Sequence, residues 1–244
     1  MDINRKRKIV AIHQPNYFPW LGYFYKIYQS DLFVFLDDVQ YSNEGMHNYT
    51  YIKTANGSFR LKYPVKQSLG DRIKEVSPKD GLGWKEKHLQ IIESNYHNAA
   101  FFITVFNDYK DIITSDYSDI VDLNTALIEF FADRLGIKTQ YVRSSDLDIN
   151  LTRTEKIIAI CKSLGADVYY SGTGAQAYQK DEDFMAAGVE LRYSVFRPFQ
   201  YPQLWEGFQS NVTALDYFMN CGYDWETVLK NQESRLKLMA LKEL

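Results

Sequence analysis

Two short apolar runs, separated by a helical pattern, open the chain. Residues 9–12 (IVAI) and 32–36 (LFVFL) are continuous and rich in β-branched or aromatic side chains, as in strands buried on both faces. Between them apolar residues recur at helical spacing over 21–28, because two prolines delay the helix until about Trp20. A strand, a helix and a second strand in close succession predict a βαβ unit with parallel strands.

The pattern changes over residues 42–80. Segments 48–53 and 58–65 flank an Asn-Gly pair, which is the strongest short signal of a hairpin. Residues 73–76 are compatible with one more strand. We therefore expect a β-rich insertion over 42–80.

Helical and strand patterns alternate through the rest of the chain. The helices are predicted over 84–94, 101–115, 118–135, 152–164 and 213–220, with a helical stretch up to about Ala187 and a charged C-terminal helix over 224–244. The strands are predicted over 138–142, 167–170 and 189–195. We expect an α/β fold in a single domain over 1–244: a mainly parallel, Rossmann-like sheet with helices on both faces, plus the β-rich insertion.

Composition excludes several classes of protein. A net charge of −3 offers no general attraction for nucleic acid. No stretch reaches the roughly 18 consecutive apolar residues of a membrane span, and no signal-peptide pattern is present. Cys161 and Cys221 lie far apart, and HxxxH and CxxC spacings are absent. We therefore expect a reduced, cytoplasmic protein without a structural metal.

The end of the first strand is the first candidate site. Polar residues His13, Gln14, Asn16 and Tyr17 follow it directly, and open parallel sheets bind ligands beyond the carboxyl ends of their strands. Histidine transfers protons near neutral pH or bonds a phosphate, and the helix that follows turns its N-terminal amides the same way. The alternative is a histidine bonded to backbone, with prolines that shape a tight turn.

A second candidate is the sequence Ser171-Gly172-Thr173-Gly174, between a predicted strand and a helix. Glycine carries no Cβ, so backbone N–H groups there can crowd an anion. The sequence is neither a Walker A motif nor GxGxxG. A simple tight turn is the alternative. Two such loops at one sheet edge favour a site more than either loop alone.

Acidic residues follow the second strand. Asp37 and Asp38, with Gln40, are placed to hold a sugar hydroxyl or Mg²⁺ or to act as a base. Alternatively, the aspartates cap the following turn. No second acidic cluster supports a two-metal site.

Two further segments carry polar side chains. Lys85 and His88 share one face of a predicted helix. Either they bind a phosphate there, or this face is exposed to solvent. The aromatic loop 196–208 either packs under the C-terminal helices or lines a pocket, and Gln203 and Asn211 are its polar groups.

Together these motifs resemble the WbqC-like family of bacterial proteins. The resemblance covers about 9–222 and rests on HQPNYFPWLGYFYKI, DLFVFLDDVQY, WKEKH, LGADVYYSGTGAQAY, YPQLW and ALDYFMNCG. It marks as motif positions His13, Gln14, Pro15, Tyr17, Trp20, Gly22, Asp37, Asp38, Gln40, His88, Ser171, Gly172, Tyr178, Gln203 and Asp216. Family members lie among genes for O-antigen and related surface polysaccharides, and glycyl (aminoacyl) transfer to sugars has been proposed for some. The resemblance implies a cytoplasmic sugar-modifying role.

The chain also departs from the family pattern. Asn48-Tyr49 stands where the family has Asn-Arg, and Thr213 stands in place of a serine. A tryptophan usual near Arg60 is missing as well. If the absent arginine binds a substrate phosphate, we expect Lys53 or Arg60 to take its place, with Asn48 beside the substrate.

Our leading hypothesis is a transferase that acylates or aminoacylates an amino group of a nucleotide-linked sugar. In it His13 deprotonates the amine, Gln14 and the Ser171–Gly174 amides hold an oxyanion or phosphate, and Asp37 or Asp38 orients a hydroxyl. The donor is open between acyl-CoA and an ATP-activated amino acid. The alternatives are an ATP-dependent ligase or nucleotidyl enzyme that uses the same cleft, and a non-enzymatic sugar-nucleotide-binding protein with a tyrosine-rich surface. The oligomeric state is open.

Overall fold

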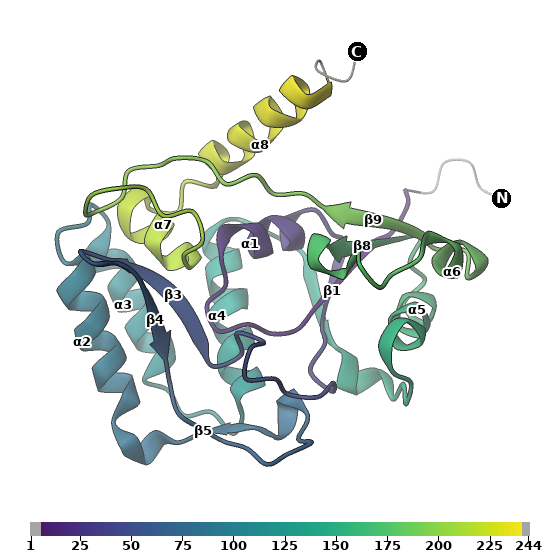
Figure 1. Cartoon of the computed structure of the whole chain (residues 1–244), viewed down its shortest axis with the longest axis horizontal. Coiled ribbons are helices and arrows are strands. Elements are labelled where there is room, and N and C mark those ends of the chain that lie inside the picture. Colours follow the sequence, from purple (N-terminus) through teal and green to yellow (C-terminus); the bar gives the residue numbers. More distant parts are fainter. Residues whose placement is uncertain (1–5, 241–244) are drawn as a thin grey trace.

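The core of the protein is a five-stranded, wholly parallel sheet (Figure 1). The computed structural model describes residues 6–240, with side chains up to residue 234. Across the sheet the strands run β7 (Gln140–Arg143), β2 (Leu32–Phe35), β1 (Ile9–His13), β8 (Val168–Gly172) and β9 (Glu190–Ser194). Every predicted strand of this sheet is present, and the predicted α/β class is confirmed.

The strand order reverses beside β1. The chain builds β1, β2 and β7 outward in one direction, then crosses through α5 (Arg153–Ser163) to β8 on the other side of β1. In the register, Ala11 of β1 lies between Phe33 of β2 and Tyr170 of β8. This is the doubly wound arrangement, whose ligand crevice lies beyond the carboxyl ends of the two strands at the reversal.

Both faces of the sheet are covered. Val10 and Ile12 of β1 point toward α5 and the short helix α6 (Asp181–Ala186), where they meet Ile160 and Phe184. Ala11 points to the opposite face, which is covered by a larger and more aromatic core. Since alternate residues of a strand face opposite sides, one continuous apolar run supplies both cores.

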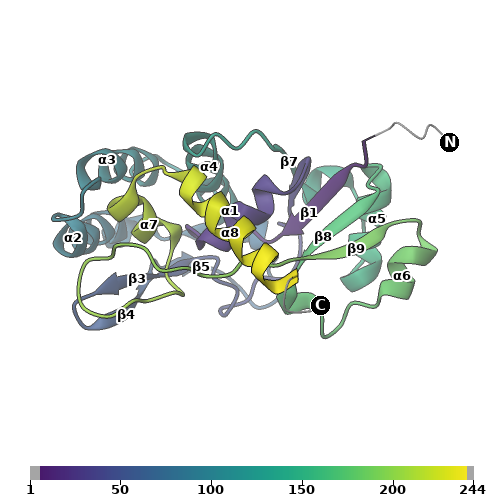
Figure 2. The same cartoon turned by 90° about the horizontal axis from the view of Figure 1, so that it is seen from above.

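The larger core joins the sheet to a helical lobe. Its helices are α1 (Leu21–Tyr28), α2 (Trp84–Tyr96), α3 (Phe102–Ile113), α4 (Ile120–Arg134) and α7 (Ala214–Cys221). Figures 1 and 2 show α2, α3 and the β3–β4 hairpin on one side of the molecule and α5 and α6 on the other. The final helix α8 (Trp225–Ala240) crosses above α1; the predicted positions 241–244 lie outside the described residues.

Segment 42–80 contains the predicted hairpin. Strands β3 (Tyr49–Thr54) and β4 (Gly57–Lys62) pair antiparallel, and Gly57 takes the positive φ of 95° that its turn requires. A second, two-residue pairing joins β5 (Val65–Lys66) to β6 (Ser77–Pro78). The division of the chain into one domain with an insertion stays a prediction.

Two local predictions were wrong. Residues Ile73–Glu75 form the 3-10 turn η1 instead of a strand, because the Glu75 carboxylate accepts the Arg72 backbone N–H at 2.7 Å and closes the turn. The helical stretch predicted up to Ala187 is shorter than expected. It consists of the 3-10 turn η4 (Thr173–Ala175) and α6. The other short turns are η2 (Asp80–Leu82) and η3 (Ser144–Leu147).

Candidate functional site

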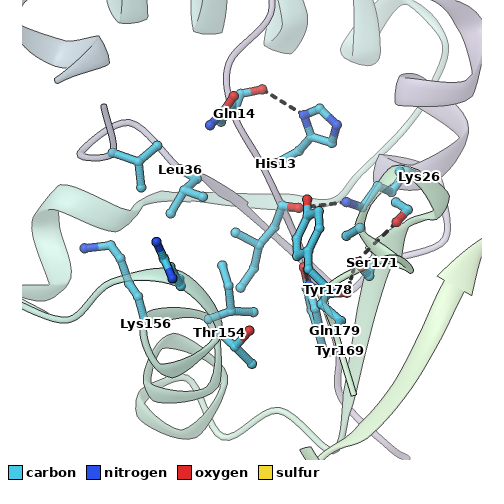
Figure 3. A pocket seen from close by; sticks show the side chains of 17 residues that line it. His13, Gln14, Lys26, Leu36, Thr154, Lys156, Tyr169, Ser171, Tyr178 and Gln179 are labelled. Carbon is cyan, nitrogen blue, oxygen red and sulfur yellow. Dashed lines mark hydrogen bonds between the residues drawn. The ribbon is translucent and has the colours of Figure 1, made fainter. Parts of the chain in front are cut away.

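Two adjoining cavities lie at the carboxyl ends of β1 and β8, where the strand order reverses. The first compartment has a volume of about 810 Å³, within the range of ligand pockets. Its lining residues come from β1, β8, α1, the segment after β2, the start of α5 and the segment 174–179 (Figure 3). The chain therefore forms this cleft at the place where doubly wound sheets bind their ligands.

His13 ends β1 and lines both compartments. Its Nδ1 lies 3.0 Å from the Gln14 carbonyl oxygen, which can only accept, so Nδ1 carries the proton and Nε2 presents a lone pair. Burial, followed by the nearby charge of Lys26, lowers the pKa of His13 to about 3. At neutral pH this histidine is uncharged and accepts hydrogen bonds at Nε2, and it takes up a proton only when a bound anion raises its pKa.

Lys26 projects from the buried face of α1 to the same place. Its side chain is 3% exposed, and its Nζ donates to the Ile12 carbonyl oxygen at 2.7 Å (Figure 3). No carboxylate of the described residues forms an ion pair with it, and burial lowers its pKa from 10.5 to about 7. An ammonium with so little compensation is costly to bury, which makes Lys26 a candidate for a functional role.

The start of α5 forms another wall of the first compartment. Thr152 is the N-cap but makes no side-chain cap hydrogen bond, and Arg153 takes the left-handed φ of 53°. Arg153, Thr154 and Lys156 line the cavity. An uncapped helix N-terminus beside an arginine favours an anion, and strained backbone of this kind tends to occur at functional sites.

Lys156 is held in place by an aspartate that does not itself line the cleft. The Lys156 Nζ donates to the Asp38 carboxylate at 2.6 Å and to the Ile149 carbonyl at 2.7 Å. Burial alone raises the pKa of Asp38, but hydrogen bonds from Lys156 and Ser144 lower it overall. Asp38 therefore neutralises and positions Lys156 at the edge of the cleft.

Asp37 lies one residue earlier, and both oxygens of its carboxylate accept hydrogen bonds within the fold. Its carboxylate accepts from the Ser145 backbone N–H at 3.0 Å and from the hydroxyls of Ser144 and Ser145. These bonds tie the end of β2 to the turn after β7. Neither aspartate is among the residues lining the two compartments.

The Ser171–Gly174 loop closes the cleft on the β8 side. Ser171 donates to the Gln179 side-chain oxygen at 2.8 Å. A Cβ built on Gly172 or Gly174 would meet no atom within 4 Å, and neither glycine has a positive φ. Neither local strain nor packing in the described structure therefore requires glycine there, whereas close approach of a ligand to the backbone would.

The second compartment, of about 440 Å³, shares a wall with the first. Both compartments are lined by His13, Lys26, Gly172 and Gly174. The second is further lined by Trp20, Gly22, Tyr23, Thr173, Gln176, Ser194, Val195, Phe196 and Arg197. His13 and Lys26 thus stand where two separate ligands would meet.

The structure brings about half of the sequence-predicted site residues to this cleft. His13, Gln14, Ser171, Gly172, Gly174 and Tyr178 line the first compartment, and Thr173 lines the second. Asn16 is buried with its side-chain oxygen unpartnered, and Gln40 pairs with Arg72 through an isolated bridge. These two residues do not line either compartment.

The other predicted residues lie within the helical lobe. The Tyr17 hydroxyl bonds Nδ1 of His88 at 3.0 Å and the Tyr109 hydroxyl at 2.6 Å. Burial lowers the pKa of His88 to about 4. Asn48 accepts from the Tyr41 hydroxyl and donates to a carbonyl. The Tyr17 contacts join α2 and α3 to the loop after β1, and the Asn48 contacts join the segments that flank the hairpin.

A second polar network fixes the aromatic loop 196–208. The Asp216 carboxylate, buried on α7, accepts from Tyr96, Tyr201 and Gln203. The Lys53 ammonium donates to the carbonyls of Trp205 and Gly207. Gln203 and Lys53 therefore hold the loop against the lobe, which agrees with the packing alternative for this segment.

Sequence reasoning missed four cations that line the two compartments: Lys26, Arg153, Lys156 and Arg197. Lys26 is the single charged residue in the apolar helix 21–28, a signal that was available. Arg153 and Lys156 stand three residues apart at a predicted helix start, which places them on one face.

Residues 6–240 show neither a cluster of metal ligands nor a membrane-spanning helix. No three His, Cys, Asp or Glu side chains come together there as metal ligands. The expectation of no structural metal stays a prediction. Across the same residues, every helix is too short or too polar to cross a membrane.

Comparison with known proteins gives a consistent match along the chain. The sequence model of the WbqC-like protein family matches residues 14–227. A protein of Mycobacterium tuberculosis (strain ATCC 25618 / H37Rv), described as "Uncharacterized protein Rv1507c", is 32% identical over 219 residues, which span 88% of this chain and 94% of that protein. No solved structure matches.

Proposed function

The chain belongs to the WbqC-like protein family, and from the geometry of its cleft we propose that it is a cytoplasmic transferase. Its reaction would acylate or aminoacylate, with a glycyl group as one option, the amino group of a nucleotide-linked sugar for surface polysaccharide synthesis. The nucleotide-linked sugar would occupy the first compartment.

The observation that carries the proposal is the pair of glycines at the end of β8. Both line the cleft, and nothing in the described structure crowds a Cβ at either position. A phosphate could approach their backbone N–H groups while Arg153 and the start of α5 face it from the other side. The apolar wall of Ile12, Leu36 and Ile157 suits a flat base or sugar face.

The proposed reaction takes place beside His13. The sugar amine attacks the carbonyl carbon of the donor, a C–N bond forms, and the bond from that carbon to the leaving group breaks. His13 Nε2 accepts the proton that the amine loses and passes it to the leaving group. The Lys26 ammonium and nearby backbone N–H groups stabilise the oxyanion. Since His13 has a low pKa in the free protein, it would act on a neutral amine.

The test is a thermal-shift and turnover comparison of three proteins. Wild type is compared with Gly172→Val and with Gly81→Val, a matched control that also has open space at Cβ but lies in η2, outside both compartments. A UDP-linked or dTDP-linked amino sugar at about 100 times Kd should raise the melting temperature of wild type and of the control by roughly 5–10 °C. We expect Gly172→Val to melt normally alone but to lose this shift.

Product formation is then measured by mass spectrometry with glycine and ATP·Mg²⁺, or with acetyl-CoA. An acylated nucleotide sugar is the expected product. A shift with ATP·Mg²⁺ in the absence of any shift with nucleotide sugars would replace this proposal with the ligase alternative. Binding without product from either donor would favour the non-enzymatic alternative.

A further inference from the structure

The second compartment has a chemical character different from the first. Trp20, Tyr23 and Phe196 form its aromatic wall, and Arg197 and Lys26 are its cations. None of its described lining residues is an aspartate or a glutamate. A cavity of this kind suits a ligand that joins an anionic group to an apolar or flat portion.

Arg197 is fixed through its backbone, which leaves its side chain available. The Arg197 N–H donates to the Gln232 side-chain oxygen at 2.9 Å, and the Gln232 side-chain N–H donates back to the Arg197 carbonyl at 2.9 Å. Gln232 lies on α8 and is 2% exposed. Among residues 6–234, whose side chains the structure describes, no hydrogen bond or ion pair of the Arg197 guanidinium is present, so no carboxylate of these residues pairs with this cavity-lining arginine.

Trp20 shapes the mouth of the compartment. Its indole folds back over Gly22 in the first turn of α1, where a Cβ would overlap the ring. The indole also meets Phe196 edge-on, with ring centroids 5.4 Å apart. Gly22 therefore allows the aromatic wall to form, and an alanine at this position would displace the indole.

We propose that the second compartment binds the acyl donor, a carboxyl group activated by a leaving group that carries phosphate. Arg197 binds the phosphate, the aromatic wall holds the rest of the leaving group, and the carbonyl lies between Lys26 and His13. This inference rests on the proposed function and assigns the second substrate to it. The sugar amine displaces the phosphate-bearing group, which leaves with the bonding electrons and receives the amine proton by way of His13.

Lys26 completes the arrangement because it lines both compartments. Among the described residues its Nζ has one hydrogen-bond partner, the Ile12 carbonyl, which leaves further N–H groups to meet a carbonyl oxygen of the donor. In this position the ammonium stabilises negative charge that develops on that oxygen. Lys26 is then a catalytic residue, whereas Arg197 binds the phosphate of the donor.

The test measures the affinity of three donor probes by calorimetry: acetyl phosphate, acetyl-CoA and 5′-O-(glycylsulfamoyl)adenosine, a stable analogue of an acyl-adenylate. Arg197→Gln should weaken at least one probe by about 10- to 100-fold, because a charge-assisted hydrogen bond is lost. The control Arg192→Gln removes an exposed arginine of β9. This arginine pairs with Glu190 and lies outside both compartments. It should leave all affinities unchanged.

A second variant tests the same site without altering charge. Gly22→Ala should weaken the same probe by displacing Trp20, while the affinity for the nucleotide sugar stays within about twofold. The probe that responds identifies the source of the phosphate. If no probe binds wild type, or if Arg197→Gln leaves every probe unchanged, the inference is wrong even where nucleotide sugars bind. If the probes respond but no nucleotide sugar binds, the proposed function fails and the donor site stands.

Discussion

Replacing Lys26 with methionine should alter stability in a way that depends on pH. The Lys26 side chain is buried, and burial lowers its pKa from 10.5 to about 7. Below pH 7 both the folded and the unfolded chain carry the charge, so the folded state bears the full cost of burying it. Between about pH 7 and 10.5 only the unfolded chain holds this proton, so stability rises with pH.

The size of the effect follows from that difference in pKa. A fall of this extent corresponds to about 5 kcal/mol of destabilisation at low pH, at about 1.4 kcal/mol per pH unit across the window. Methionine removes this cost but leaves the Ile12 carbonyl without its partner, which costs about 1–3 kcal/mol. The Lys26→Met variant should therefore be more stable than wild type by about 2–4 kcal/mol at pH 6.

The assay is urea unfolding of both proteins at pH values from 6 to 9.5, with the slope m compared to verify that the same surface unfolds. The advantage of Lys26→Met should shrink by about 3 kcal/mol across this range. Taking the difference between the two proteins cancels the other groups that titrate. A difference that stays constant within about 1 kcal/mol would refute the reasoning, because Lys26 would then titrate as an exposed lysine does.

Two further predictions concern the groups around the cleft. The His13 ring should show no titration between pH 8 and 5 by NMR, and its pKa should rise in Lys26→Met because the neighbouring ammonium is gone; a wild-type midpoint near 6.5 would contradict a ring that is neutral over this range. Asp38→Asn should destabilise the fold by about 3 kcal/mol at pH 7, because the buried Lys156 loses its counter-charge. Urea unfolding measures this loss, and a change below about 1 kcal/mol would mean that water compensates Lys156 instead.

Much of the sheet could be predicted because its strands are buried on both faces. The runs 9–12 and 32–36 contain only apolar residues, which is the signature of parallel strands covered on both sides. The hairpin was predictable from Gly57, whose positive φ few other residues adopt. The turn at 73–75 was not, because the four residues of 73–76 (IKEV) fit a strand equally well until the Glu75 contact is known.

Only the part of the candidate site that directly follows predicted strands could be predicted from the sequence. The loops that begin at His13 and Ser171 were expected at one edge of the sheet, and the pairing of Ala11 with Tyr170 brings them together. Arg153 belongs to the same cleft because the crossover through α5 returns beside β1. That return depends on tertiary packing and leaves no mark in the local sequence.

Residues of one family motif also serve different purposes, which a sequence pattern cannot separate. His13 and Tyr17 are four positions apart in the same loop, yet His13 faces the cleft and Tyr17 bonds His88 in the lobe. Both are polar side chains in a loop with prolines and aromatic residues, so both look functional in the sequence. The distinction lies in what remains unpaired: the Tyr17 hydroxyl has two protein partners, whereas His13 Nε2 has none among the described residues. On this criterion the lobe network orients the loop after β1, and the free groups of His13 and Lys26 mark where a substrate would complete the bonding.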